Sequence, residues 1–207
     1  MSKWIRRGVV PSLCLLAGAT SGCGDYVRQG WGPSLATVAV LEASSGAEPA
    51  RFGGTLGSDV VTYVKKTIDG AEVRVPTIFT DSGRATLSVQ PKDPSITEPS
   101  ALTAVTFTRY RVTYRRADGR NAPGVDVPYP FDSAVTVTVN PGSTAQAGFD
   151  IVRVVAKGEA PLVGLVNSDN FISTIAEVTF YGKDHSGNDV SAAGSIGITF
   201  GNFGDPD

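Results

Sequence analysis

The stretch Ala134–Val139, with the sequence AVTVTV, alternates apolar and polar residues and decides the fold class. Successive side chains of an extended strand point to opposite faces of a sheet. The valines therefore share one face and the threonines the other, which is the pattern of a half-buried strand. The stretch predicts a sheet that packs one face against a core.

The same period of two recurs along the chain from Leu35 onward. Similar runs occur at Ala36–Ala43, Asp59–Ile68, Ala71–Phe79, Arg84–Gln90, Thr103–Arg116, Ala145–Val155, Ile175–Gly182 and Ser195–Phe200. Turn-forming clusters separate them, among them Asp69-Gly70, Asp81-Ser82-Gly83, Asp118-Gly119, Asn140-Pro141-Gly142 and Ser186-Gly187-Asn188. About nine short strands with such turns predict an all-β sandwich or barrel. Of the two we expect the sandwich, with residues 35–207 forming a single antiparallel domain.

The longest run, Thr103–Arg116, changes the parity of its apolar positions. They are odd at Val105 and Phe107, and even at Tyr110, Val112 and Tyr114. A β-bulge near Thr108-Arg109 would put both sets on one face by adding one residue. A break into two shorter strands is the alternative.

Three arginines of this run, Arg109, Arg111 and Arg115, alternate with the second apolar set. We expect the aromatic face to lie in the core and the arginine face to meet solvent. The arginines would then pair with acids on neighbouring strands, or form a basic stripe that binds anionic envelope components such as lipid headgroups or acidic glycan.

Composition excludes several classes of protein. Of the 207 residues, 18% are charged, and 25 valines and 19 threonines favour strands. This composition does not fit a coiled coil, a collagen, a disordered tail or a polytopic membrane protein.

The first 22 residues have the pattern of a secretory signal. Lys3, Arg6 and Arg7 precede the apolar run Val9–Ala19, which is too short to span a bilayer. Small residues then lead into Cys23. We expect residues 1–22 to be cleaved, residues 23–34 to form a flexible tether, and the mature chain to carry 15 basic and 20 acidic residues. A net-acidic domain of this kind is a poor partner for nucleic acid.

The segment Ser21–Asp25, SGCGD, resembles the processing site of bacterial lipoproteins. The segments Thr108–Asp132 and Ile172–Val190 are similar to uncharacterised bacterial lipoproteins with an immunoglobulin-like β-sandwich domain. The resemblance implies lipidation of Cys23, export, and a membrane anchor in the cell envelope, at the outer membrane if the cell has two. An ordinary signal peptide with an incidental cysteine is the alternative.

The residues offer little for catalysis or for cofactors. The single histidine, His185, lies in a predicted turn, so a Ser-His-Asp or zinc site is not expected. Asp126 and Asp132 are a weak carboxylate pair for glycoside hydrolysis. Asp184, Asn188 and Asp189 are a weak calcium candidate, and such residues more often stabilise turns. We therefore predict neither an enzyme nor a cofactor, and we expect Gly53–Gly57 to form a loop rather than a phosphate site.

The Pro-rich stretch Val125–Phe131 carries Tyr129 and Phe131, which either form a binding platform or pack under their own loop. Trp31 is a further exposed-aromatic candidate. Three functions remain: a structural or adhesive envelope lipoprotein, a carbohydrate- or peptidoglycan-binding module, and a hydrolase. The first is our prediction, with an envelope glycan or another envelope protein as partner.

Overall fold

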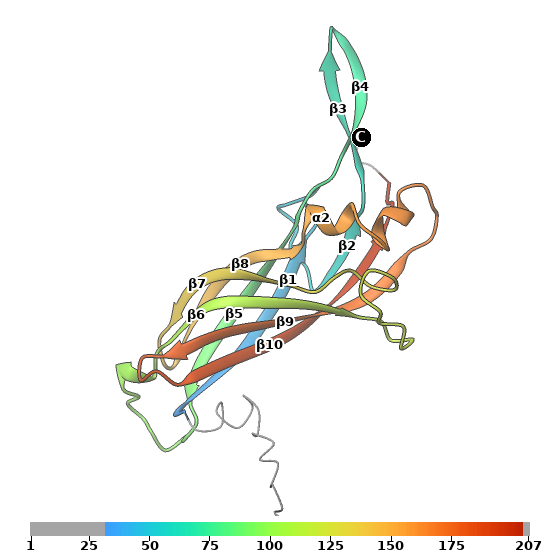
Figure 1. Ribbon diagram of the computed structural model, residues 1–207. Helices are drawn as coiled ribbons and strands as arrows, with labels where there is room; N and C mark the ends of the chain where they lie inside the picture. The colour runs from blue at the N-terminus through green and yellow to red at the C-terminus, as the bar shows by residue number, and fades with distance from the viewer. Residues whose placement is uncertain (1–31, 205–207) are drawn as a thin grey trace, which may run out of the picture.

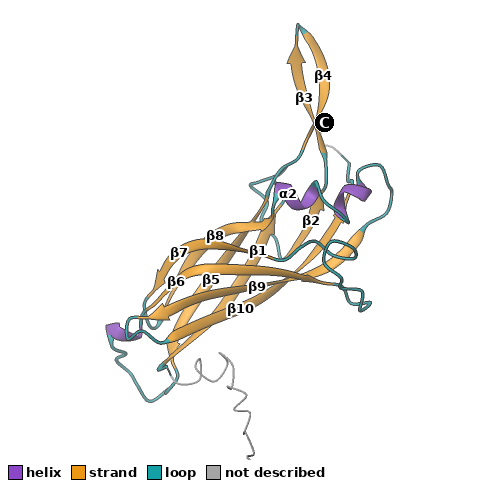
Figure 2. Ribbon diagram, viewed as in Figure 1, coloured by secondary structure: helices purple, strands orange, loops and turns teal. Residues whose placement is uncertain are grey.

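The computed structural model describes residues 32–204. In this range the protein consists mainly of β-strands (Figures 1 and 2). The strands are β1 (Ser34–Ser44), β2 (Thr55–Asp59), β3 (Thr62–Ile68), β4 (Ala71–Thr77), β5 (Asp81–Pro91), β6 (Val105–Arg115), β7 (Phe131–Val139), β8 (Ser143–Val152), β9 (Ile172–Asp184) and β10 (Asp189–Gly201). The short helices are α2 (Val154–Lys157), η1 (Ala101–Thr103) and η2 (Leu162–Leu165). None of the helices found in residues 32–204 could span a lipid bilayer.

Two sheets face each other across one core. The first has the order β1-β5-β8 and the second the order β2-β10-β9-β6-β7. All pairs in them are antiparallel except β2, which runs parallel to β10. The all-β prediction is therefore confirmed.

The chain crosses from the first sheet to the second between β1 and β2. Strand β1 also lies close to β10. A Cβ built on Gly194 of β10 would be 3.0 Å from Cγ1 of Val38 on β1. The two sheets thus approach each other at this edge, where a larger residue than glycine would push β1 away.

Strand β2 corrects one sequence-based expectation. Gly53–Gly57 was expected to be a loop, but Thr55–Gly57 belongs to β2 and pairs with Gly197–Thr199 of β10. A glycine-rich sequence has a low intrinsic strand preference, and here the pairing with a distant strand decides the conformation.

The β-bulge in the longest strand is confirmed. The register of β6 shifts between Phe107 and Arg109 against both of its neighbours, β7 and β9. As a result the apolar residues on both sides of the bulge are buried on one face: Val105, Phe107, Tyr110, Val112 and Tyr114.

The close approach of the strands at the bulge also explains why residue 182 is a glycine. Gly182 of β9 pairs with Phe107, and a Cβ there would lie 2.2 Å from the backbone oxygen of Thr106. We expect Gly182→Ala to lower the free energy of unfolding by about 1–3 kcal/mol, because two paired backbones would have to separate. Urea denaturation measures this change.

Gly197→Ala is the matched control, since a Cβ on Gly197 meets only a methyl group of Thr55, at 3.8 Å. It should change the urea midpoint far less than Gly182→Ala. Equal midpoints for the two variants would contradict the close approach at the bulge.

Aromatic rings fill the centre of the core. Phe180 is fully buried, and its ring centroid lies 5.4 Å from that of Phe149, 6.1 Å from that of Tyr110 and 6.4 Å from that of Phe107. These rings come from β6, β8 and β9, so they join the two sheets.

Candidate functional site

One hairpin departs from the body of the sandwich. Strands β3 and β4 pair with each other and form a separate two-stranded sheet, which we call the arm (Thr62–Thr77). Figure 1 shows the arm extending beyond the end of the sandwich that carries α2 and η2. Its turn is Asp69-Gly70, with φ of 52° and 83°, values that suit an Asp-Gly hairpin turn.

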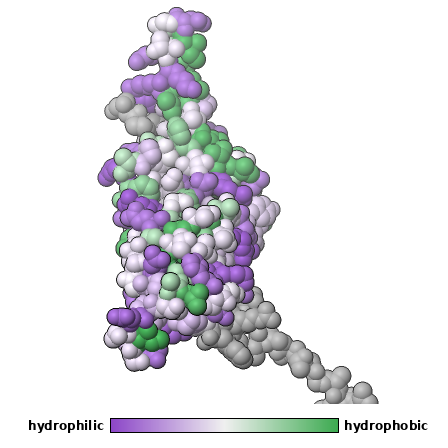
Figure 3. All heavy atoms as spheres, turned by 90° about the vertical axis from the view of Figure 1, so that its left-hand side faces the viewer, coloured by the Kyte–Doolittle hydropathy of each residue, from purple (hydrophilic) through white to green (hydrophobic). Residues whose placement is uncertain are grey.

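The two faces of the arm differ in chemistry. The register pairs Val64 with Val75, Lys66 with Val73 and Ile68 with Ala71, so one face is apolar around a single lysine. The other face combines Tyr63 with Pro76, Lys65 with Arg74 and Thr67 with Glu72. Figure 3 shows polar and apolar side chains side by side on the arm.

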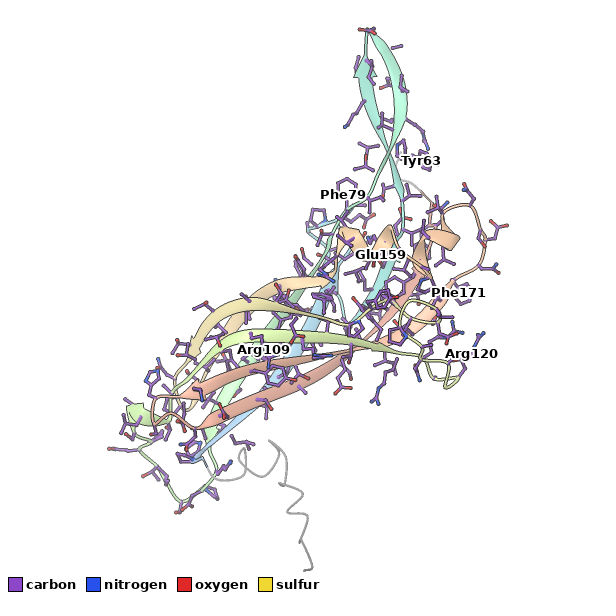
Figure 4. All side chains as sticks on the ribbon, in the orientation of Figure 1. Tyr63, Phe79, Arg109, Arg120, Glu159 and Phe171 are labelled. Atoms are coloured by element: carbon purple, nitrogen blue, oxygen red, sulfur yellow. The ribbon has the colours of Figure 1, made fainter. Side chains whose placement is uncertain are left out.

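The apolar face of the arm meets solvent near its tip. Ile68 is 49% exposed and Val73 is 42% exposed. A two-stranded hairpin without a packing partner is marginally stable in water. The arm therefore depends on its attachment to the sandwich, where Tyr63 and Phe79 lie (Figure 4).

A buried polar cluster lies where the arm joins the sandwich. Asp81 begins β5 just after the arm, and its carboxylate is fully buried. Nζ of Lys157, which is 1% exposed, lies 2.9 Å from each carboxylate oxygen. The hydroxyl of Ser58 donates to Oδ2 at 2.6 Å, and the backbone N–H of Gly46 donates to Oδ1 at 2.9 Å. Four segments thus meet at one carboxylate. We call Asp81, Lys157, Ser58 and Gly46 the base cluster, because they lie at the base of the arm.

The surroundings of Asp81 act on its pKa in opposite directions. Burial has the largest effect and raises the pKa of the carboxyl above its usual value, while the charge of Lys157 and the bond from Ser58 lower it. The net direction is upward. The contacts of the Asp81 carboxylate thus offset only part of the free-energy cost of removing it from water.

A second buried carboxylate lies where the chain passes from β2 into the first strand of the arm. Asp59 ends β2 and accepts a hydrogen bond from Thr62 Oγ1 at 2.7 Å, and its other oxygen accepts from the backbone N–H of Phe203 at 3.2 Å. Both strands of the arm therefore leave the sandwich beside satisfied buried carboxylates.

The three arginines of β6 lie on the exposed face, as the alternation predicts, and each has an acidic partner. Arg109 and Arg111 bind Asp132 on β7 at 2.5 and 3.0 Å, and Arg115 lies 3.4 Å from Glu177 on β9. Arg109 also stacks on Tyr181 at 4.1 Å. This is the charge-paired arrangement, and exposed pairs of this kind contribute about 0–1 kcal/mol.

The stretch Val125–Phe131 does not present an aromatic platform. Phe131 begins β7 and is buried, with its ring against Tyr110 and under Arg153. Tyr129 is 53% exposed and its ring lies against Gly124, where a Cβ would clash with it. Phe131 therefore offers no ring face to a ligand.

The weak calcium candidates serve a turn. Oδ1 of Asp184 accepts the backbone N–H groups of Ser186 and Asn188, and Oδ2 accepts the side-chain amide of Asn188. Asp189 binds Lys183 at 2.6 Å. Residues 32–204 contain no cluster of three or more His, Cys, Asp or Glu that could hold a metal ion.

The other candidate groups are dispersed. His185 is exposed in the β9–β10 turn, with Nε2 3.5 Å from Oγ1 of Thr106. Asp126 accepts from the backbone N–H of Ala122, and Asp132 is bound to the two arginines. Cys23, Trp31 and the predicted signal 1–22 lie outside the described residues.

The base cluster escaped the sequence analysis. Asp81 was assigned to a turn, and Lys157 was not singled out. The signal was the position of Lys157 at the end of Val154–Lys157, a short and otherwise apolar stretch that one residue separates from β8. A lysine in such a context is buried only if it is paired.

Comparison with known proteins gives no relative for this all-β protein. No family model, no curated protein and no solved structure matches the chain.

Proposed function

We propose that the chain is an exported, non-enzymatic lipoprotein of the bacterial cell envelope, anchored at Cys23, whose arm contacts another envelope component. The domain itself is proposed to be an immunoglobulin-like β-sandwich. The role is structural or adhesive, and the anchor places the protein at the outer membrane if the cell has two membranes.

The strand order supports an immunoglobulin-like topology. Such domains set strands A, B, E and D against strands C, F and G, and the variable type adds C′ and C″ beside C. Strands β1, β5 and β8 correspond to A, B and E, and β6, β9 and β10 to C, F and G, with β7 beside β6 in the place of C′. The arm then is an insertion in the connection between the first two strands of that topology.

The observation that carries the proposal is the position of the arm. Ser34, where the chain enters the sandwich, bonds to Thr103 at one end, and the arm leaves from the opposite end (Figure 1). A chain anchored through residues 23–34 would therefore direct the arm away from the membrane. An exposed apolar face around Lys66 suits contact with a partner better than contact with water.

The alternative is a carbohydrate- or peptidoglycan-binding module. Sugar binding by such a module would draw on exposed rings. Tyr129 and Phe171 are exposed at the arm end, and Figure 4 shows Phe171 beside the loop that carries Arg120. With Phe131 buried, we favour the arm as the contact element.

A photo-crosslinking residue at Ile68 tests the proposal in intact cells. We expect a discrete crosslinked species with this variant and none with the crosslinker at Val125, which is also exposed but lies off the arm. Denaturing electrophoresis of membrane fractions measures the difference. Equal crosslinking at both positions, or none at Ile68, contradicts contact through the arm.

Cys23→Ala tests the anchor in the same experiment. Without the lipidated cysteine, the protein should leave the membrane fraction and lose its crosslink at Ile68, because stable membrane attachment needs the acyl chains. If the protein stays with salt-washed membranes, the lipid is not the anchor.

A further inference from the structure

We infer that Lys157 and Asp81 are joined by an intramolecular isopeptide bond, formed by the base cluster itself. The attacking nitrogen and the carboxyl group are already in contact, at 2.9 Å from Nζ to both oxygens. Reacting groups held this close gain a large effective concentration, because most of the entropy of bringing them together is already lost on folding.

The environment favours an amide over an ion pair. Both side chains are at most 1% exposed, so the charged pair lacks solvation by water. Burial also raises the pKa of the Asp81 carboxyl, so its neutral form is easier to reach than in water. Reaction needs the neutral pair, in which an amine is the nucleophile and a protonated carboxyl is the electrophile. A neutral amide then removes two buried charges from the core.

Two further donors act on the carboxyl oxygens. The N–H of Gly46 donates to Oδ1, the oxygen that would carry negative charge in the tetrahedral intermediate. The hydroxyl of Ser58 donates to Oδ2 at 2.6 Å, the oxygen that would leave. Both donors, the backbone N–H of Gly46 and the side-chain hydroxyl of Ser58, already contact the carboxyl oxygens in the unreacted pair.

The step balances without a co-reactant. The lone pair of the neutral amine Nζ forms a bond to Cγ of the protonated carboxyl. One N–H proton is transferred to Oδ2, with Ser58 bonded to that oxygen. The Cγ–Oδ2 bond breaks and Oδ2 leaves as water with two protons, and the amide keeps the remaining N–H.

A solvent-exposed pair in the same chain is the internal control. Lys183 and Asp189 are 2.6 Å apart, closer than Lys157 and Asp81, but their side chains are 63% and 52% exposed. Water solvates both charges there, so this pair should stay ionic. Comparison of the two pairs therefore separates the effect of burial and of the two donors on amide formation from the effect of proximity.

Peptide mapping of the full chain tests the bond. Trypsin cannot cleave after an acylated lysine, so digestion of denatured wild-type protein should give peptide 75–84 joined to peptide 154–183, lighter than their sum by one water molecule. Lys183 should be cleaved normally. Recovery of free peptides 75–84 and 154–157 from the wild-type protein would overturn the inference.

Two variants define the chemistry. Lys157→Met should yield peptide 75–84 unlinked. Ser58→Ala keeps both linked residues and should slow linkage after synthesis about 100-fold, the usual effect of removing a donor from a reacting oxygen. Linkage at an unchanged rate in Ser58→Ala would contradict the role of the Ser58 hydroxyl, and a linked product in Lys157→Met would contradict the assignment of Lys157.

Discussion

Phe180→Ala should lower the free energy of unfolding by about 3–5 kcal/mol. The ring of Phe180 is fully buried and contacts rings from both sheets, so its removal leaves a cavity that neighbouring strands cannot close. Urea denaturation followed by far-UV circular dichroism measures the loss.

Tyr181→Ala is the matched control for this experiment, because residues 180 and 181 lie on opposite faces of β9. Tyr181 contacts Arg109 on the outer face, and loss of that stacking should cost about 0.5–1 kcal/mol. If Tyr181→Ala lowered the free energy of unfolding more than Phe180→Ala, the assignment of the buried and exposed faces of β9 would be wrong.

Tyr114→Ala should also cost about 3–5 kcal/mol. Tyr114 is buried, its ring lies 5.9 Å from that of Phe200, and its hydroxyl donates to the carbonyl of Ile151 on the facing sheet at 2.6 Å. Tyr114→Phe separates the two contributions, since it removes only the hydrogen bond and should cost about 1–3 kcal/mol. Thermal and urea unfolding measure both variants.

Arg111→Ala provides the contrast on the same strand. Its partner Asp132 keeps the bond from Arg109, so the change should stay within about 1 kcal/mol. If Arg111→Ala destabilised the protein more than Tyr114→Ala, the assignment of the β6 faces would be wrong.

Local patterns predicted the strands and their faces well. The parity change in Thr103–Arg116 predicted the bulge, and the alternation of arginine with aromatic residues predicted which face of β6 is buried. Asp69-Gly70 likewise predicted the hairpin turn. In each case neighbours along the chain carry the information.

Long-range pairing was beyond the sequence patterns. The conformation of Thr55–Asp59 depends on β10, and the burial of Lys157 depends on a carboxylate 76 positions away. The runs that form β3 and β4 were recognised as strands, yet their departure from the sandwich follows from which sheet edges other strands occupy. Such features are decided by tertiary packing.

The crossing of the chain from β1 to β2 has a mechanical consequence. Tension between Ser34 and the arm would act along β1 and β2, which lie roughly along the line between the two ends (Figure 1). The ladder from Ser34↔Pro91 to Ser44↔Ser82 would then be loaded in shear, so that its hydrogen bonds share the force rather than break one after another. The parallel pairing of β2 with β10 would be loaded in the same way, and the domain would transmit a pull from one end to the other through two sheets at once.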